Sequence, residues 1–239
     1  MILNYRTGAR HDVSVMGSGS SAGGLLGKVR INGDGRIYDS ADCFVFRCNG
    51  SAGVEGSMRC EDARVNGHLS VRDDLETEQI KVNGGLKAGG SARIRVGHIN
   101  GDLDIGETLS AVRLTVYGTL EAGGEIGAEH LNVRGAVESG DALYGREIRL
   151  KLVSSSRVKR MMGEHISVTV SLLARMIGRT KLEVDMIEGD EIVLEHTRAD
   201  MVRGRRVKIG PGCTIGRVEY SEVFDSDRDS DVADVIRTF

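Results

Sequence analysis

The chain has 239 residues, a formal net charge of −3, four cysteines and no tryptophan. Its longest apolar run, residues 43–46, is far below the roughly 18 residues that a membrane helix needs, and we expect no signal peptide. The charge gives no general attraction to nucleic acid, and so few cysteines exclude a disulfide scaffold and predict reduced thiols in the cytoplasm. Because glycine is abundant (33) and proline almost absent (1), we expect many tight turns between strands.

The first 11 residues are expected to form a mobile N-terminal arm. Its apolar tip is a candidate for weak, reversible membrane contact, because three aliphatic side chains bury little area on their own. The residues proposed for this contact are Met1, Ile2, Leu3, Tyr5 and Arg6. The alternative is a disordered terminus without a membrane role.

Glycine recurs every 17 residues through the next part of the chain, at Gly33, Gly50, Gly67, Gly84, Gly101, Gly118 and Gly135. The first five of these follow an asparagine, and Asn-Gly favours a tight turn because both residues tolerate positive φ. Apolar residues alternate with polar ones between the turns, which is the period of a β-strand. The pattern is translated from repeat to repeat and never mirrored, so neighbouring strands should be parallel.

The repeat therefore predicts an all-β fold: a single-stranded, right-handed parallel β-helix, or β-solenoid, of triangular section with 17 residues per coil, over residues 12–152. It starts with an N-terminal capping coil that steps by 16, because Val13 and Val15 match Val29 and Ile31. The inward positions, predicted to form the core, include Val65, Leu69, Val82, Leu86, Ile99, Leu103, Val116, Leu120, Val133 and Val137.

The phase breaks after Leu152, and alternation resumes near residue 166. Ile192 and Ile209 are again 17 apart, so residues 153–222 are predicted to form a less regular solenoid extension. Residues 223–239 are rich in aspartate and are predicted to be a mobile acidic C-terminal tail with a short helix at its end.

Few residues indicate chemistry. The six histidines fall in different columns of the repeat, so we expect no metal site. Cys43 and Cys60 share one column and are predicted to be inward-packed free thiols. No GxGxxG, P-loop, HExxH or GxSxG motif is present, so we expect no cofactor and no catalytic residue. The basic segment 145–181 is interpreted as a solvated face, with RNA or lipid contact as the alternative.

Three stretches in this order resemble the bactofilins, in particular the long Bacillus-type form, the polymer-forming cytoskeletal proteins. They are the phased Val-x-Ile-Asn-Gly units led by the glycine-serine segment 17–24, the segment 46–56, and the pair 187–192 and 207–216. The resemblance covers residues 12–222. It implies a right-handed β-helix that polymerises end to end, without nucleotide, into non-polar filaments. It also implies a scaffold role in cell shape, envelope or motility, often at the inner membrane face. The extra half, residues 153–222, and the lack of proline depart from the family pattern.

Physical reasoning leads to a similar expectation, because a parallel solenoid ends in open strand edges that are templates for pairing. The candidate polymer interface is the layer of Val13 and Val15, over Val29, Ile31 and Phe46. We therefore expect a cytoplasmic, non-enzymatic scaffold whose partner is itself, with a paralogous bactofilin as a second candidate, and no nucleic acid or small-molecule substrate. The alternatives are a β-helix carbohydrate-active enzyme, a hexapeptide-like acyltransferase suggested by residues 209–216, or a monomeric solenoid adaptor.

Overall fold

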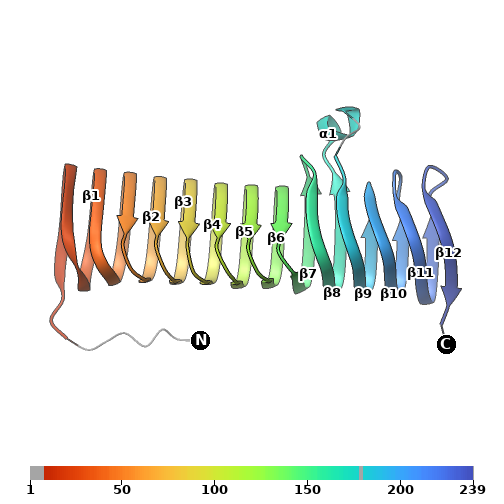
Figure 1. Cartoon of the computed structure of the whole chain (residues 1–239), viewed down its shortest axis with the longest axis horizontal. Helices are drawn as coiled ribbons and strands as arrows, with labels where there is room; N and C mark the ends of the chain where they lie inside the picture. The colour runs from red at the N-terminus through yellow and green to blue at the C-terminus, as the bar shows by residue number, and fades with distance from the viewer. Residues whose placement is uncertain (1–7, 178–179, 239) are drawn as a thin grey trace. The chain divides into compact units, whose positions relative to one another are not determined.

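The computed structural model describes residues 8–177 and 180–238, which are almost entirely β-strand with one short helix. The chain divides into two compact units, residues 1–117 and residues 118–239. In each unit the strands are parallel and lie coil upon coil, with about 17 residues per turn in the regular part (Figure 1). The predicted all-β parallel solenoid is therefore confirmed.

The first unit holds β1 to β4 and most of β5. Their bounds are β1 (His11–Val54), β2 (Met58–Val71), β3 (Leu75–Ala88), β4 (Ala92–Ile105) and β5 (Leu109–Ala122). Successive strands pair with the predicted offset of 17, as where Met58 pairs with Leu75 and Leu75 with Ala92. β1 is long because it runs through the first coils without a break at their Asn-Gly turns.

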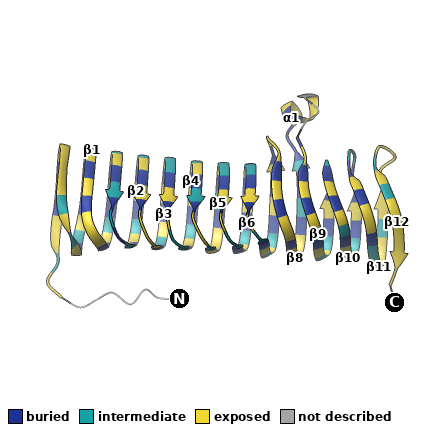
Figure 2. Ribbon diagram, in the orientation of Figure 1, coloured by how far each residue is buried: buried dark blue, intermediate teal, exposed yellow. Residues whose placement is uncertain are grey.

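The core of the first unit consists of aliphatic columns that follow this register. Leu69, Leu86 and Leu103 pair in succession and are at most 2% exposed. Val65, Val82 and Ile99 form a second column of the same kind, and Val116 is also buried. Figure 2 shows the resulting alternation of buried and exposed residues along each strand. The inward assignments made from the sequence are correct for these residues.

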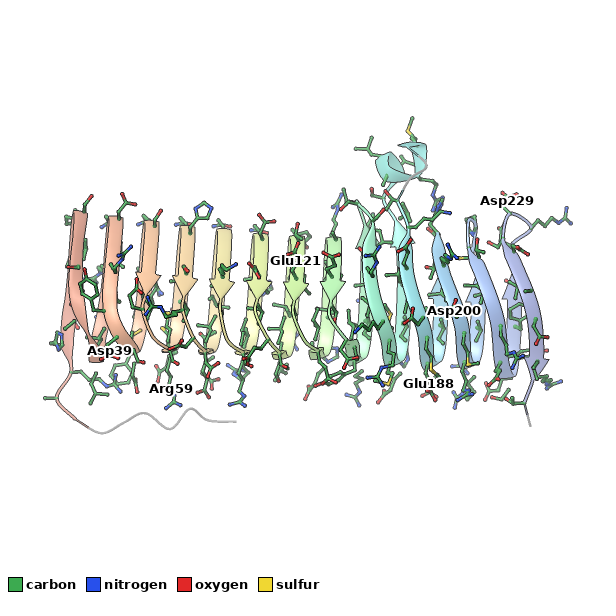
Figure 3. All side chains as sticks on the ribbon, in the orientation of Figure 1. Asp39, Arg59, Glu121, Glu188, Asp200 and Asp229 are labelled. Atoms are coloured by element: carbon green, nitrogen blue, oxygen red, sulfur yellow. The ribbon has the colours of Figure 1, made fainter. Side chains whose placement is uncertain are left out.

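Polar ladders line the outside of the same coils. The amide of each repeat asparagine donates to the amide oxygen of the one before it, at 2.8–2.9 Å, from Asn100 back to Asn32. Ion pairs also join neighbouring coils, such as Arg59 with Glu76 at 2.9 Å (Figure 3 labels Arg59). Exposed pairs of this kind contribute little stability each, so their main effect is to favour the 17-residue register.

The second unit holds the end of β5, seven further strands and the helix. Their bounds are β6 (Ile126–Ser139), β7 (Ala142–Leu152), β8 (Ser156–Val170), α1 (Leu172–Ile177), β9 (Leu182–Leu194), β10 (Thr197–Ile209), β11 (Thr214–Ser226) and β12 (Asp231–Arg237). Leu120, Val133 and Val137 are buried as predicted, and Val133 begins a column that continues through Leu150 and Val168.

Coil length varies in the second unit, and one register prediction is wrong. β7 and β8 pair with an offset of 18, whereas β8 and β9 pair with an offset of 26 because α1 lies between them. Ile192 pairs with Val207, an offset of 15, and not with Ile209. This coil is short because only Glu195 and His196 form the turn between β9 and β10, with His196 at φ 47°.

The acidic C-terminal segment forms strand where the sequence suggested a mobile tail with a helix. β11 extends to Ser226, and β12 pairs with β11 at an offset of 17. Val232 and Val235 of β12 lie beside Ile215 and Val218, so they continue the core columns. The sequence signal was weak because these valines are three residues apart, which breaks the strict alternation of a flat strand.

Candidate assembly surfaces

The N-terminal edge, defined here as residues 11–17, is the first described strand segment of the first unit. The Asp12 carboxylate accepts from the amide of Lys28, and the amide group of Asn32 lies 3.3 Å from the sulfur of Met16, both at an offset of 16. This confirms the predicted step of the first coil. By the same offset, Val13 lies over Val29 and Val15 over Ile31.

The five residues of the predicted polymer interface form successive layers. Val13 and Val15 are 7% and 8% exposed, whereas Val29, Ile31 and Phe46 are at most 1% exposed. Only the first two can therefore take part in a contact, and the other three support them from below. The residues proposed for membrane contact, Met1, Ile2, Leu3, Tyr5 and Arg6, lie outside the described part of the chain.

Arg10 connects the first coils, which the sequence did not indicate. Its guanidinium donates to the carbonyl oxygens of Leu26 and Asp42 at 2.9 and 2.6 Å, and it pairs with the Asp42 carboxylate at 2.9 Å. It also lies 4.4 Å from the centre of the Phe44 ring, a cation–π contact. The expected mobile arm therefore does not extend to Arg10, and β1 begins at His11.

The C-terminal edge, defined here as β12, leaves more apolar surface uncovered. Among the described strands β12 pairs only with β11. Val232 is half-buried, while Val235 is 42% and Ile236 is 37% exposed. The residues on which the two valines stack, Ile215 and Val218, are at most 1% exposed. The last apolar layer of the second unit is thus partly open to solvent, next to a strand edge with unpaired backbone groups.

Charged groups surround this edge without covering it. The turn before β12 carries Asp227 and Asp229, and Figure 3 shows Asp229 on that turn. The Asp234 carboxylate pairs with Arg217 of β11 at 3.1 Å, which fixes β12 in register. Negative groups at the edge would favour a partner surface with cations, or a register that alternates the charges.

One open groove of about 770 Å³ in the first unit bears on the enzymatic alternative. Small and polar residues line it, together with His68, Glu55 and Asp104. Glu55 and Asp104 already form ion pairs, with Arg72 and Lys87, and within the described residues His68 has no hydrogen-bond partner. No cluster of three or more metal-ligating side chains occurs in the described ranges. The groove therefore brings together no acid–base pair.

The four cysteines are free and buried, as predicted for Cys43 and Cys60, which lie side by side in register. A hydrogen bond with Cys43, together with burial, raises the pKa of Cys60. Burial, assisted by the nearby Asp34 carboxylate, raises the pKa of Cys48 to about 11. These thiols are therefore protonated at neutral pH and form part of the core.

The comparisons with known proteins identify relatives from one organism. The chain is 56% identical over 223 residues to the "Uncharacterized protein YhbE" of Bacillus subtilis, covering 91% of this chain and 94% of YhbE. It is 43% identical over 89 residues to the "Uncharacterized protein YhbF" of the same organism, and that match spans 36% of this chain but only 37% of YhbF. No family model and no solved structure matches. No described helix is long and apolar enough to cross a membrane.

Proposed function

The chain belongs to the same family as YhbE of Bacillus subtilis, and we propose that it is a non-enzymatic scaffold protein that assembles end to end into filaments through the edges of its β-solenoid. The observation that carries the proposal is the C-terminal edge, where a strand paired on one side lies beside Val235, which is 42% exposed. The resemblance of the 17-residue repeat to the bactofilins supports the same function.

A second copy would supply what each edge lacks. Its edge strand offers backbone donors and acceptors, and its last core layer offers apolar cover for Val232 and Val235. Fully burying one valine contributes about 1.5–3 kcal/mol, so two edges together can hold a joint without any ligand. Assembly should then need neither nucleotide nor divalent cation, because both contributions are present in the chain itself.

We extend the proposal to partners and location. The main partner is a second copy of the same chain, and a related chain with the same coil geometry is a second candidate. The bactofilin resemblance implies a cytoplasmic scaffold at the inner face of the membrane that serves cell shape, envelope or motility.

Electron microscopy and sedimentation in EDTA test the proposal. The parent chain should form filaments, whereas Val235→Asp should place a charge in the joint and give a small species with unchanged circular dichroism. Val193→Asp is the matched control, because Val193 is 38% exposed but lies in β9, away from the edge. This variant should still assemble.

Two outcomes would overturn the proposal. A parent chain that remains a monomer at concentrations of tens of micromolar would favour the monomeric adaptor. Filaments that persist in Val235→Asp but disappear in Val193→Asp would show that the joint uses a lateral face of the solenoid.

A further inference from the structure

Helix α1 presents an apolar tip that the solenoid does not need. Leu172, Leu173 and Met176 are 74%, 75% and 79% exposed, which makes them three of the four most exposed large apolar side chains among the described residues. α1 lies between β8 and β9 and projects from the second unit in Figure 1. Leaving three large aliphatic side chains in water is unfavourable, so this arrangement calls for a function.

The base of this tip is packed and hydrogen-bonded, so its orientation is fixed by the fold. Ala174 is 2% exposed and faces the solenoid, and the Ser171 hydroxyl accepts from its amide at 3.3 Å. The Arg175 guanidinium pairs with Glu195 at 2.6 Å. The amide of Ser171 donates to the carbonyl oxygen of Leu152 at 2.8 Å, and Thr180 is buried on the other side of the insertion. The three apolar side chains therefore point outward from a fixed base.

Cations without acidic partners lie beside the tip. Lys151 of β7 and Lys181 just before β9 are exposed, and neither forms an ion pair with a described residue. Arg134 and Lys151 lie directly opposite each other in register, and the next residue in that row is Thr169, near the start of α1. Like charges directly opposite each other are unfavourable in a sheet, and an anionic surface nearby would relieve this cost.

We propose that α1 inserts Leu172, Leu173 and Met176 shallowly into an anionic lipid bilayer, with Lys151 and Lys181 contacting the headgroups. The size of the tip favours a bilayer over a protein partner, because a stable protein interface buries roughly 800 Å² on each side, far more than three side chains offer. An apolar tip flanked by lysines is instead the composition that binds at a membrane interface. One tip binds weakly, and several copies on one scaffold would bind together by avidity.

Flotation of the full chain with vesicles tests this inference. The chain should float with vesicles of phosphatidylglycerol and phosphatidylcholine and much less with phosphatidylcholine alone. The variant L172S/L173S/M176S should lose at least about tenfold in partitioning. The variant K151E/K181E should weaken binding at low salt and have little effect at high salt, because salt screens exposed charges. M162S is the matched control, since Met162 is also exposed (38%) but lies in the middle of β8.

The remaining outcomes each overturn the inference. Equal flotation of the parent and the triple serine variant would exclude α1, and loss of flotation only when residues 2–7 are deleted would assign the contact to the N-terminal segment. A triple serine variant that changes its oligomeric state without vesicles would show that the tip contacts a second copy. Filament formation by electron microscopy is recorded in parallel, so a failure of assembly is distinguished from a failure of membrane contact.

Discussion

At the scale of single residues, the repeat glycines restrict the coil most strongly. Gly67 has φ +130°, a backbone conformation that residues with a side chain rarely adopt. A Cβ atom at this position would also collide with the carbonyl oxygen of Gly50 in the preceding coil. The close approach of the two backbones at this corner explains why the 17-residue glycine period is so regular in the sequence.

We predict that Gly67→Ala destabilises the first unit by at least about 3 kcal/mol, because strain and collision act together. Gly53→Ala is the control. A Cβ at Gly53 would meet no atom within 4 Å, so its stability should change by less than about 1 kcal/mol. Chemical denaturation followed by circular dichroism measures both. Equal midpoints for the two variants would contradict the prediction.

A second prediction at this scale concerns Cys48. Its pKa is raised from 9.0 to about 11 in the folded chain, so the folded state retains a proton that the unfolded state releases. This stabilisation is fully present below pH 9 and is lost as the pH rises through about 11. The free energy of unfolding should therefore fall by up to about 3 kcal/mol across that range.

Denaturation curves across this pH range measure the effect. Cys48→Ala should have a smaller alkaline decrease than the parent, although its stability at neutral pH will also be lower because a buried side chain is shortened. Parallel curves for the parent and the variant would show that Cys48 does not cause the alkaline loss.

At the scale of elements, the regular coils could be predicted from the sequence and the irregular ones could not. The columns through Leu69 and Val65 were visible because every coil of the first unit has the same length. The 15-residue coil after Ile192 was missed because turn length depends on how a few residues such as His196 close the corner, which no period reveals. The strand β12 was missed because acidic composition obscured two core valines. The role of Arg10 has no sequence signal, since it depends on contacts with Asp42 and Phe44.

The core columns give a prediction for the elements β3 and β4. Leu103 is 1% exposed and lies against Leu86, so Leu103→Asp would bury a charge without a partner. We expect a loss well above about 3 kcal/mol, which would unfold the first unit. Asp102→Asn, at the exposed neighbouring position, should melt like the parent. A soluble Leu103→Asp variant with unchanged melting temperature would refute the inward assignment.

At the scale of the whole molecule, the two candidate edges differ in how much apolar surface they offer. The valines of the N-terminal edge are at most 8% exposed, whereas Val235 at the C-terminal edge is 42% exposed. A joint between two C-terminal edges should therefore be the tighter one, because it removes more apolar area from water. The sequence favoured the N-terminal edge, because the alternation of Val13 and Val15 was easy to recognise and β12 was not.

This difference predicts how a filament is taken apart. In the non-polar arrangement that the bactofilin resemblance implies, like edges meet, so Val15→Asp should break only the N-terminal joint and leave dimers held through β12. In a head-to-tail filament each joint contains one edge of each kind, so Val15→Asp and Val235→Asp should both give monomers. Analytical ultracentrifugation of the two single variants and the double variant distinguishes these arrangements. Dimers for Val15→Asp and monomers for the double variant are the expected result. If like edges meet, Val235→Asp should also give dimers, held by the weaker N-terminal joint and dissociating at higher concentration than those of Val15→Asp. Monomers for both single variants would show that the filament is polar.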